Sequence, residues 1–505
     1  MNTAAYLEIV RDAARVVQYG SDGSFAVACK ADGRDALWVP RGAPLPAASE
    51  AIVLIDETEH LDPAQFRALI ADVAAALARG GLLVMRTTPV RHTLRDAYAH
   101  VRETGLRIAA HGVEPGDAGT WYLVARRDPA AGGVPKADGS VVWEGEFFTA
   151  NSLAAVNREL VSATLTAGEH SVHILRTEVA DHLAKAERNR MAQVAAHAIA
   201  APDGADIWIR HPWPPYFDRP PARTYVHMQM WEYGALPRDW VAARDVIDEV
   251  WCPSSYVAGL YTSAAFDPAR VRVIPLGIDP SVFRVDGPRL KLPTQKAFRF
   301  CYVGGTIERK GIDVLLSAYT RTFTAADDVT LIIKDFGVSD TYTGMNYRAL
   351  IERITQTPGM PEILYVDQLL ESETLASLYR SADAYVHPYR GEGFALPVLE
   401  AMACGLAPIT TRGGATDDFV DESVGYPIPA TRRAIGNHAH GHDLIDEGRL
   451  LEPDAAALAQ TMLRVVRERS ERLERGRAAA ARAATWSWQR SGERVCERIA
   501  ALRTR

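Results

Sequence analysis

Short apolar runs alternate with longer segments of helical periodicity along most of the chain. One clear pair is the run Val141–Trp143 and the segment that begins at Ser152, in which Val156, Leu160 and Ala163 recur on one helical face. Regular alternation of strands and helices is typical of parallel sheets that are covered by helices. The pattern therefore predicts an α/β protein.

The same reasoning divides the chain into three groups of strands. Residues 129–139, rich in Pro, Gly and Ala, are predicted to be a linker between the first two groups. The predicted domains are residues 1–128, 140–285 and 286–480, followed by an Arg-rich helix over residues 481–505. Strands are predicted at residues 15–18, 36–39, 51–55, 82–86, 106–109, 121–125, 141–143, 172–175, 207–209, 225–227, 250–251, 271–274, 298–303, 331–333, 363–366, 385–387 and 407–410, and a helix at residues 63–79.

The first group of strands has a glycine-containing turn, Tyr19–Gly23, and the segments IVLIDETEHL and ALARGGLLVMRTT. In element order and in these segments it resembles the core of class I methyltransferases. The binding residues differ from that pattern, because the turn lacks a third glycine and Pro40-Arg41 stands where a carboxylate would hold a ribose. Residues 1–128 are therefore interpreted as a shortened methyltransferase-like domain without cofactor, used for docking or as a scaffold.

The most informative stretch is residues 387–416, HPYRGEGFALPVLEAMACGLAPITTRGGAT. A predicted strand leads into a loop where Glu392 lies between two glycines, and a helix is predicted from Pro397 to Gly405 with Glu400 in its early turns. Glycines and a helix N-terminus favour an anion, whereas carboxylates accept hydrogen bonds from hydroxyl groups. An anion next to several hydroxyl groups describes a nucleotide sugar.

Glu392 and Glu400 resemble the Glu-x7-Glu motif of retaining glycosyltransferases of family 4, and EGFALPVLEAMACG is close to that family's pattern. The likeness covers residues 140–490. It implies a GT-B fold, in which two Rossmann-like domains face a cleft, preceded here by the small methyltransferase-like α/β domain. It also implies transfer of a sugar, with retention, from a nucleotide-diphosphate sugar to a hydroxyl acceptor in bacterial surface glycan or protein glycosylation.

The segment Gly304–Gly311, GGTIERKG, places two glycines at a strand end and two basic residues ahead of a helix. Backbone N–H groups and an ammonium group suit a departing diphosphate, although a tight turn with basic surface residues is the structural alternative. The resemblance matches Lys310 to the family's lysine. Gly305 stands where the family has an arginine, so Arg309 or Arg390 is expected to take its place.

The resemblance also implies a set of donor-binding residues. Glu392 would face the transferred sugar, and Glu400 would accept hydrogen bonds from the ribose. The structural alternatives are a solvated loop acid and a carboxylate that stabilises its own helix. The predicted donor-binding residues are Gly304, Gly305, Arg309, Lys310, Glu392, Gly393, Phe394, Ala395, Leu396 and Glu400.

His227 ends a predicted strand at a position where the family often carries a histidine in the cleft. An imidazole there could donate to a sugar hydroxyl or move a proton, although a lone histidine at a strand end is more often structural. The predicted catalytic residues are Glu392, His227 and Lys310, and the predicted acceptor-side residues are Glu144, Gly145 and Glu232.

Metal and cofactor chemistry are not expected. His438, His440 and His442 alternate in a Gly-containing stretch, where a solvated loop is a better interpretation than a set of metal ligands. Lys310 and helix dipoles can neutralise a diphosphate without a metal ion. The prediction is therefore a metal-independent enzyme whose nucleotide sugar is a substrate and not a bound cofactor.

Composition narrows the classes of function. The chain of 505 residues has 48% hydrophobic and 24% charged residues, which is typical of a globular protein. Its formal net charge of −7 gives no basic surface for nucleic acid. Five scattered cysteines fit a reducing compartment, and no secretory signal or membrane-spanning run is evident, so a cytoplasmic location is expected. The Arg-rich end could make weak peripheral contact with the membrane, although interleaved Glu residues favour a solvated helix.

The expected partners are a nucleotide-sugar donor and a glycan, lipid-linked or protein acceptor. One alternative is a nucleotide-sugar-binding scaffold without turnover, which the missing arginine at Gly305 favours. Another is a bifunctional methyltransferase-glycosyltransferase, which Pro40-Arg41 disfavours. Hydrolysis of the donor separates the first two hypotheses, and binding of S-adenosylmethionine tests the third.

Overall fold

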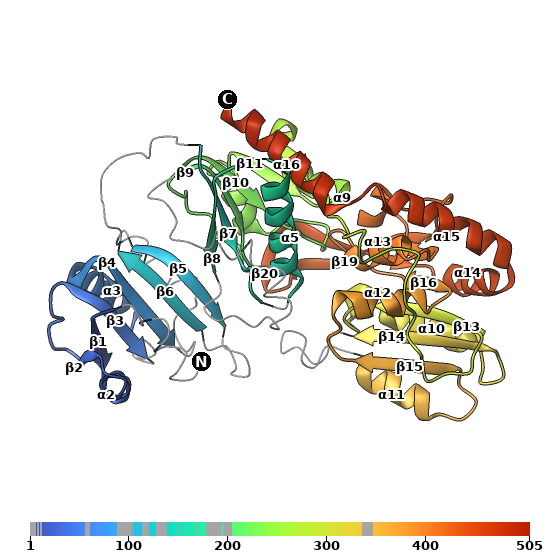
Figure 1. Cartoon of the computed structure of the whole chain (residues 1–505), viewed down its shortest axis with the longest axis horizontal. Coiled ribbons are helices and arrows are strands. Elements are labelled where there is room, and N and C mark those ends of the chain that lie inside the picture. Colours follow the sequence, from blue (N-terminus) through green and yellow to red (C-terminus); the bar gives the residue numbers. More distant parts are fainter. Residues whose placement is uncertain are drawn as a thin grey trace. The chain divides into compact units, whose positions relative to one another are not determined.

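The computed structural model describes residues 13–55, 61–87, 106–113, 121–127, 139–149, 151–168, 170–177, 205–335 and 347–504, with residues 7, 10, 101, 104 and 194 (Figure 1). The chain forms two compact units. The first unit comprises residues 1–161, 170–216 and 220–224, and the second comprises residues 162–169, 217–219 and 225–505. Most of the predicted linker, residues 129–138, lies outside the described residues.

The first unit opens with a six-stranded sheet that contains all six strands predicted for this region. Its order is β2-β1-β3-β4-β6-β5, and β6 runs antiparallel to both of its neighbours while the other pairs are parallel. The strands are β1 (Arg15–Gly20), β2 (Asp35–Pro40), β3 (Ser49–Ile55), β4 (Leu77–Thr87), β5 (Leu106–Val113) and β6 (Trp121–Arg127), with helices α2 (Ser24–Ala31) and α3 (Pro63–Ala76). The helix predicted at residues 63–79 ends earlier, because β4 begins at Leu77.

The glycine turn after β1 is covered by an aromatic side chain. The indole N–H of Trp38, on β2, donates to the carbonyl oxygen of Gly20 at 3.0 Å. A Cβ atom on Gly23 would lie 2.9 Å from the Trp38 ring. Trp38 therefore fills the space directly against the turn where a ligand of a doubly wound sheet would bind.

The remaining strands of the first unit form a parallel group in which β7 pairs with β8 and β9. These strands are β7 (Val141–Gly145), β8 (Val172–Arg176) and β9 (Ala205–His211), and helix α5 spans Ser152–Ala167. The division between the two units falls within β10 (Ala222–Met228). In the second unit β10 pairs in parallel with β11 (Glu249–Cys252), which pairs with β12 (Val271–Val273). Helices α8 (Arg238–Ala242) and α9 (Ser255–Ser263) and the short helix η1 (Pro268–Arg270) belong to this part of the chain.

The second unit contains a parallel sheet of six strands in the order β15-β14-β13-β16-β17-β18. The order reverses between β13 and β16, and such a switch point opens a ligand crevice at the carboxyl ends of the strands. The strands are β13 (Phe298–Val303), β14 (Val329–Asp335), β15 (Glu362–Asp367), β16 (Ala384–His387), β17 (Pro408–Thr411) and β18 (Tyr426–Ile428). The helices are α10 (Ile312–Thr322), α11 (Arg348–Gln356), α12 (Ser372–Arg380), α13 (Leu396–Ala403), α14 (Ala455–Arg467), α15 (Arg469–Ala483) and α16 (Trp488–Arg503), with η2 (Glu308–Lys310) and η4 (Ala415–Asp418).

Helices cover both faces of this sheet. Apolar side chains of α10, α11 and α14 share one buried cluster with alternate residues of the strands, including Phe300, Leu331 and Ile409. On the other face α13 packs against β16 and β17, and the ring of Tyr379 on α12 lies 5.8 Å from that of Tyr385 on β16. The sheet is thus buried on both faces, as its continuous apolar strands indicate.

The prediction of a solvated loop around His438, His440 and His442 is wrong. These residues belong to an antiparallel hairpin of β19 (Ala430–Ala439) and β20 (His442–Pro453), which forms a separate two-stranded sheet. Its two-residue turn has positive φ at both positions, 49° at His440 and 80° at Gly441, as a tight hairpin turn requires.

Gly311 fixes the connection between η2 and α10. It adopts φ 69°, and a Cβ atom there would lie 1.8 Å from the carbonyl oxygen of Pro388.

We predict that Gly311→Ala lowers the free energy of unfolding by about 3 kcal/mol or more, because strain in the backbone adds to a backbone clash. Gly359→Ala is the matched control, since Gly359 has φ 80° and open space around it; it should cost about 1 kcal/mol. Equal losses in urea unfolding would contradict this account.

Candidate active site

Three loops meet at the carboxyl edge of β13 and β16. The β13–α10 loop, residues 304–311, begins at Gly304-Gly305 and contains η2. The β16–α13 loop, residues 388–395, follows His387. The backbone N–H groups of Arg390 and Gly391 donate to the carbonyl oxygen of Arg309 at 2.7 and 3.2 Å, so these two loops are joined directly. The third is the β10–α8 loop, residues 229–237, which carries Glu232.

Glu392 lies at the centre of this arrangement and is 7% exposed. One carboxylate oxygen accepts hydrogen bonds from Lys310 Nζ at 2.8 Å and from His387 Nε2 at 3.0 Å. The other oxygen lies 3.8 Å from Arg309 Nη1. The structure therefore brings together Glu392, Lys310 and Arg309, which the sequence predicted, with His387, which it did not.

The surrounding cations determine the charge of Glu392. Burial by itself would raise the pKa of this carboxyl, but Lys310, the hydrogen bond from His387 and Arg309 together hold the pKa well below its usual range. Glu392 is therefore an ionised carboxylate over the whole physiological range of pH. Such a group can accept hydrogen bonds from hydroxyls and stabilise positive charge.

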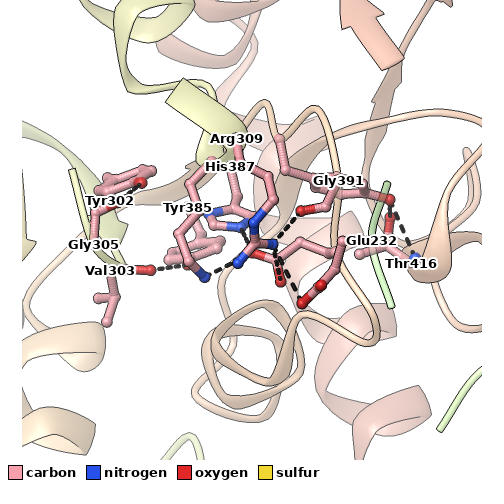
Figure 2. A network of polar contacts seen from close by, with 12 residues as sticks. Glu232, Tyr302, Val303, Gly305, Arg309, Tyr385, His387, Gly391 and Thr416 are labelled. Atoms are coloured by element: carbon pink, nitrogen blue, oxygen red, sulfur yellow. Dashed lines mark hydrogen bonds and ion pairs between the residues drawn. The ribbon is translucent and has the colours of Figure 1, made fainter. Parts of the chain in front are cut away.

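His387 is buried and fixed by aromatic side chains. Its ring stacks on Tyr302 at 5.5 Å and on Tyr385 at 6.1 Å, and the hydroxyls of these tyrosines donate to the carbonyl oxygens of Gly305 and Val303 (Figure 2). Burial lowers the pKa of His387, which favours the neutral ring. Its Nδ1 has no hydrogen-bond partner among the described residues, so a neutral ring donating through Nε2 to Glu392 is the tautomer that fits.

Glu400, on α13, has a different environment. Its carboxylate accepts a hydrogen bond from the Tyr379 hydroxyl at 2.9 Å. Burial raises the pKa of Glu400 to about 7, although Tyr379 and the nearby Lys334 act in the opposite direction. The environments of the two glutamates therefore act in opposite directions, lowering the pKa of Glu392 and raising the pKa of Glu400.

The backbone between Glu392 and Glu400 has an unusual conformation at Ala395. Ala395 adopts φ 69° and ψ 56° as the N-cap of α13, a left-handed conformation that usually requires glycine. The helix begins at Leu396, one residue before the predicted start. The Phe394 side chain packs on Phe419 and Trp486 with ring centroids 5.2 and 6.0 Å apart, so only its backbone can serve a ligand.

Glu232 joins the site from the β10–α8 loop. Arg309 Nη1 lies 3.5 Å from the Glu232 carboxylate and donates to the carbonyl oxygen of Gly391 at 2.6 Å (Figure 2). The guanidinium also lies 6.0 Å from the ring of Tyr233. Arg309 thus links the predicted acceptor-side carboxylate to the loop that carries Glu392.

Arg390 has a structural role. Its five N–H groups donate to Asp313 through two bonds of 2.7 Å, to Glu452 through two bonds of 2.8 Å and to the carbonyl oxygen of Glu308 at 2.7 Å. A guanidinium has five donors, so all of them are used within the protein. Arg309 or Arg390 was expected to replace the missing cation at Gly305; the donors of Arg390 are used within the protein, and the role of Arg309 stays a prediction.

His227 and Glu144 are both buried within the protein. The His227 ring contacts Phe217, Trp240 and Tyr261 at 5.1, 5.9 and 6.4 Å, and its side chain is 0% exposed. Contact with a substrate would require these rings to move, and the catalytic role of His227 stays a prediction.

Glu144, in the first unit, accepts hydrogen bonds from Trp208 at 2.7 Å, from Arg210 at 2.6 Å and from the Tyr216 hydroxyl. A Cβ atom on Gly145 would lie 2.8 Å from the carbonyl oxygen of His211. Local packing therefore accounts for both residues, and their roles on the acceptor side stay predictions.

The part of the chain that the structure describes contains no group of three or more His, Cys, Asp or Glu side chains that could hold a metal ion. His438 pairs with Asp443 at 3.0 Å, and His442 lies 3.7 Å from Asp239. Metal independence stays a prediction. Among the described helices, none is long and apolar enough to cross a membrane.

Solved structures share this fold at low sequence identity. Sucrose-phosphate synthase from Thermosynechococcus elongatus aligns with a TM-score of 0.51 and 17% identity, over 72% of this chain and 99% of that protein. Anabaena Alr3699/HepE in complex with UDP and glucose aligns with a TM-score of 0.50 and 13% identity over the same shares. The aligned 72% of the chain therefore has the fold of the GT-B glycosyltransferases.

One family model matches the segment that contains Lys310, Glu392 and Glu400. Residues 289–482 match the family of glycosyl transferases group 1. The MMP alpha-(1->4)-mannosyltransferase of Mycolicibacterium hassiacum is 26% identical over 37% of this chain, and a D-inositol 3-phosphate glycosyltransferase of Arthrobacter sp. is 28% identical over 45%. The chain spans 42% and 49% of the lengths of these two relatives. The methyltransferase resemblance of residues 1–128 stays a prediction.

The raised pKa of Glu400 gives a direct test of the site's electrostatics. We predict that a Glu side-chain carbon signal titrates near pH 7 in ¹³C NMR and disappears in Glu400→Gln. In Tyr379→Phe the midpoint should move upward, because the lost hydroxyl no longer stabilises the carboxylate. A Glu400 signal that titrates near the ordinary glutamate value of about 4.3 would contradict the burial argument.

Proposed function

We propose that this chain is a glycosyltransferase that moves a sugar, with retention, from a nucleotide-diphosphate sugar to a hydroxyl acceptor. The observation that carries the proposal is the ion pair of Lys310 and Glu392 at 2.8 Å beside the Gly304-Gly305 turn. Both side chains lie at the carboxyl edge of one Rossmann-like sheet, where Lys310 would provide a cation for the diphosphate and Glu392 a carboxylate for sugar hydroxyls. The match of residues 289–482 to glycosyl transferases group 1 supports the same function.

In the proposed complex, the diphosphate lies on the backbone of Gly304 and Gly305 and against Lys310. As negative charge develops on the leaving diphosphate, the ammonium group and backbone N–H groups stabilise it. Glu400 would accept hydrogen bonds from the ribose hydroxyls, and the peptide groups of residues 393–396 would contact phosphate and sugar. This assignment needs no metal ion for charge neutralisation, so we propose a metal-independent reaction.

The transfer step breaks the bond between the anomeric carbon and the phosphate oxygen and forms a bond from that carbon to the acceptor oxygen on the same face. The acceptor proton passes to the leaving diphosphate. Glu392, held ionised by Lys310 and His387, would stabilise the positive charge that develops on the sugar ring. Glu232 would orient the acceptor hydroxyl from the opposite loop, with Arg309 between the two carboxylates.

We further propose that residues 1–128 serve as a docking or scaffold domain that binds no cofactor. The position of Trp38 against Gly20 and Gly23 supports this, because a ligand on the glycine turn would have to displace the indole. The acceptor is proposed to be part of a surface glycan, a lipid-linked sugar or a protein, reached from the cytoplasmic side.

Donor binding is tested by a thermal-shift screen of UDP, GDP, ADP and CDP. We predict that one nucleoside diphosphate stabilises the wild type by about 2.7 kcal/mol at 100 times its dissociation constant. In Lys310→Ala the same nucleotide should give a much smaller shift, because the cation that faces the diphosphate is gone. Lys291→Ala, an exposed lysine in the same unit, is the control and should keep the full shift.

An assay for release of free sugar from the matching nucleotide sugar then distinguishes the two hypotheses. An enzyme would release the sugar, whereas a scaffold would only bind the nucleotide sugar. Nucleotide binding without turnover in the presence of acceptor extracts would favour the scaffold. No shift with any of the four nucleotides, together with a shift by S-adenosylmethionine, would overturn the proposal and move attention to residues 1–128.

A further inference from the structure

The β19–β20 hairpin, residues 430–453, extends from the second unit without a third strand. Among its apolar side chains, Ala439, Leu444 and Leu450 are buried, with 7%, 0% and 7% exposed. An isolated two-stranded ribbon is at best marginally stable in water. The hairpin must therefore owe its order to the surfaces on which these side chains rest.

One of these surfaces is the β10–α8 loop. The backbone N–H groups of Arg449 and Ile445 donate to the carbonyl oxygens of Tyr233 and Leu236 at 2.9 and 3.0 Å. Leu444 forms an isolated bridge with Pro237. At the hairpin tip the His440 ring stacks on Tyr233 at 6.0 Å, and the His442 ring meets the edge of Trp231 at 5.8 Å. The hairpin thus adds a strand-like edge to the loop that carries Glu232.

The other surfaces are the two donor-side loops. The backbone N–H of Leu451 donates to the carbonyl oxygen of Arg390 at 2.8 Å, and Glu452 accepts both of its hydrogen bonds from the Arg390 guanidinium. Arg433 donates to Glu308, beside Arg309, at 2.8 Å. Main-chain bonds and ion pairs therefore tie the hairpin to the loop that carries Glu392 and to the loop that carries Lys310.

Two glycines allow these segments to approach so closely. A Cβ atom on Gly234, which has φ 80°, would lie 2.5 Å from the carbonyl oxygen of Arg449. A Cβ atom on Gly391 would lie 2.5 Å from the carbonyl oxygen of Glu232. The backbone of the β10–α8 loop is thus in direct contact with the hairpin on one side and with the β16–α13 loop on the other.

We infer that the β19–β20 hairpin is a brace that positions Glu232 against Arg309 and Glu392 before any ligand binds. The roles of these three residues rest on the proposed function, whereas the brace is a property of the free protein. Residues of the hairpin act through the loops they hold, and its backbone groups are the main ties. The acceptor-side carboxylate then needs no closing movement to reach the donor loop.

The brace is tested by hydrogen–deuterium exchange of the ligand-free full chain, compared between Gly234→Ala and Gly441→Ala. Both glycines have φ 80°, so the backbone strain is matched, but only Gly234 faces the hairpin backbone, and Gly441 has open space. The amides of Ile445, Arg449 and Leu451 should be protected in the wild type and in Gly441→Ala. In Gly234→Ala they should exchange at least about tenfold faster, because the hairpin separates from the loop.

Fast exchange of these amides in the wild type, or unchanged protection in Gly234→Ala, would overturn the brace. If Gly234→Ala does not fold, Glu452→Gln gives the second test. It removes the ion pairs to Arg390 and Arg433 and should speed exchange at Leu451 about threefold or more, whereas unchanged exchange would count against the inference.

A kinetic comparison distinguishes positioning from a merely structural role. With the nucleotide sugar that the thermal-shift screen selects, Gly234→Ala should bind the nucleoside diphosphate within about twofold of wild type but turn over about tenfold more slowly. Equal losses of binding and turnover would indicate general damage. If the wild type binds no nucleotide, the proposed function fails, while the exchange experiment still decides whether the brace exists.

Discussion

The site depends on one buried carboxylate, that of Glu392, whose negative charge is balanced by neighbouring cations and a hydrogen-bond donor. Glu392 is almost completely removed from water, and an unpaired carboxylate there would be costly. Lys310, His387 and Arg309 supply the compensation, and each comes from the end of a strand or the loop after it. The need to satisfy this charge therefore fixes the ends of β13 and β16 against one another.

The same arrangement explains why the loops are rich in glycine and tied by their backbones. Gly311 lies against the carbonyl oxygen of Pro388. Arg390 donates all five of its side-chain N–H groups to Asp313, Glu452 and the backbone of Glu308. These contacts leave Arg309 and Lys310 pointing toward Glu392. Under the proposed function, a pair of cations restrained in this way would be preorganised for a diphosphate, because little reorganisation is needed when negative charge arrives.

Much of the architecture could be predicted from the sequence because buried parallel strands read as short apolar runs. In the sheet of the second unit, β13 to β17 follow that rule, and the exception is β18, which has only three residues and pairs with β17. The six strands of the N-terminal sheet were also predicted from their apolar runs, although β6 runs antiparallel to both of its neighbours. The β19–β20 hairpin was missed for a related reason. Ten of the 22 residues in its two strands are exposed, and apolar residues do not alternate regularly with polar ones along either strand, so no period-two pattern marks it.

Within the site, the motif residues Glu392, Lys310 and Arg309 could be predicted, but their partners could not. His387 acts on Glu392 from the strand end five positions earlier, and only the fold shows that its ring turns toward the carboxylate. Its position as the last residue before a glycine-rich loop was the one available signal. Arg390 was a reasonable candidate for a phosphate contact until Asp313 and Glu452, distant in sequence, were seen to occupy its guanidinium.

The most direct measurement is a crystal structure of the full chain with the nucleoside diphosphate selected by the screen. The account predicts the diphosphate on the backbone of Gly304-Gly305 within hydrogen-bond distance of Lys310 Nζ, and the ribose at Glu400. It also predicts that Glu232, Arg309 and Glu392 keep the arrangement of the free protein. A nucleotide bound elsewhere, or one that leaves the ion pair of Lys310 and Glu392 out of contact with the phosphates, would contradict the central claim.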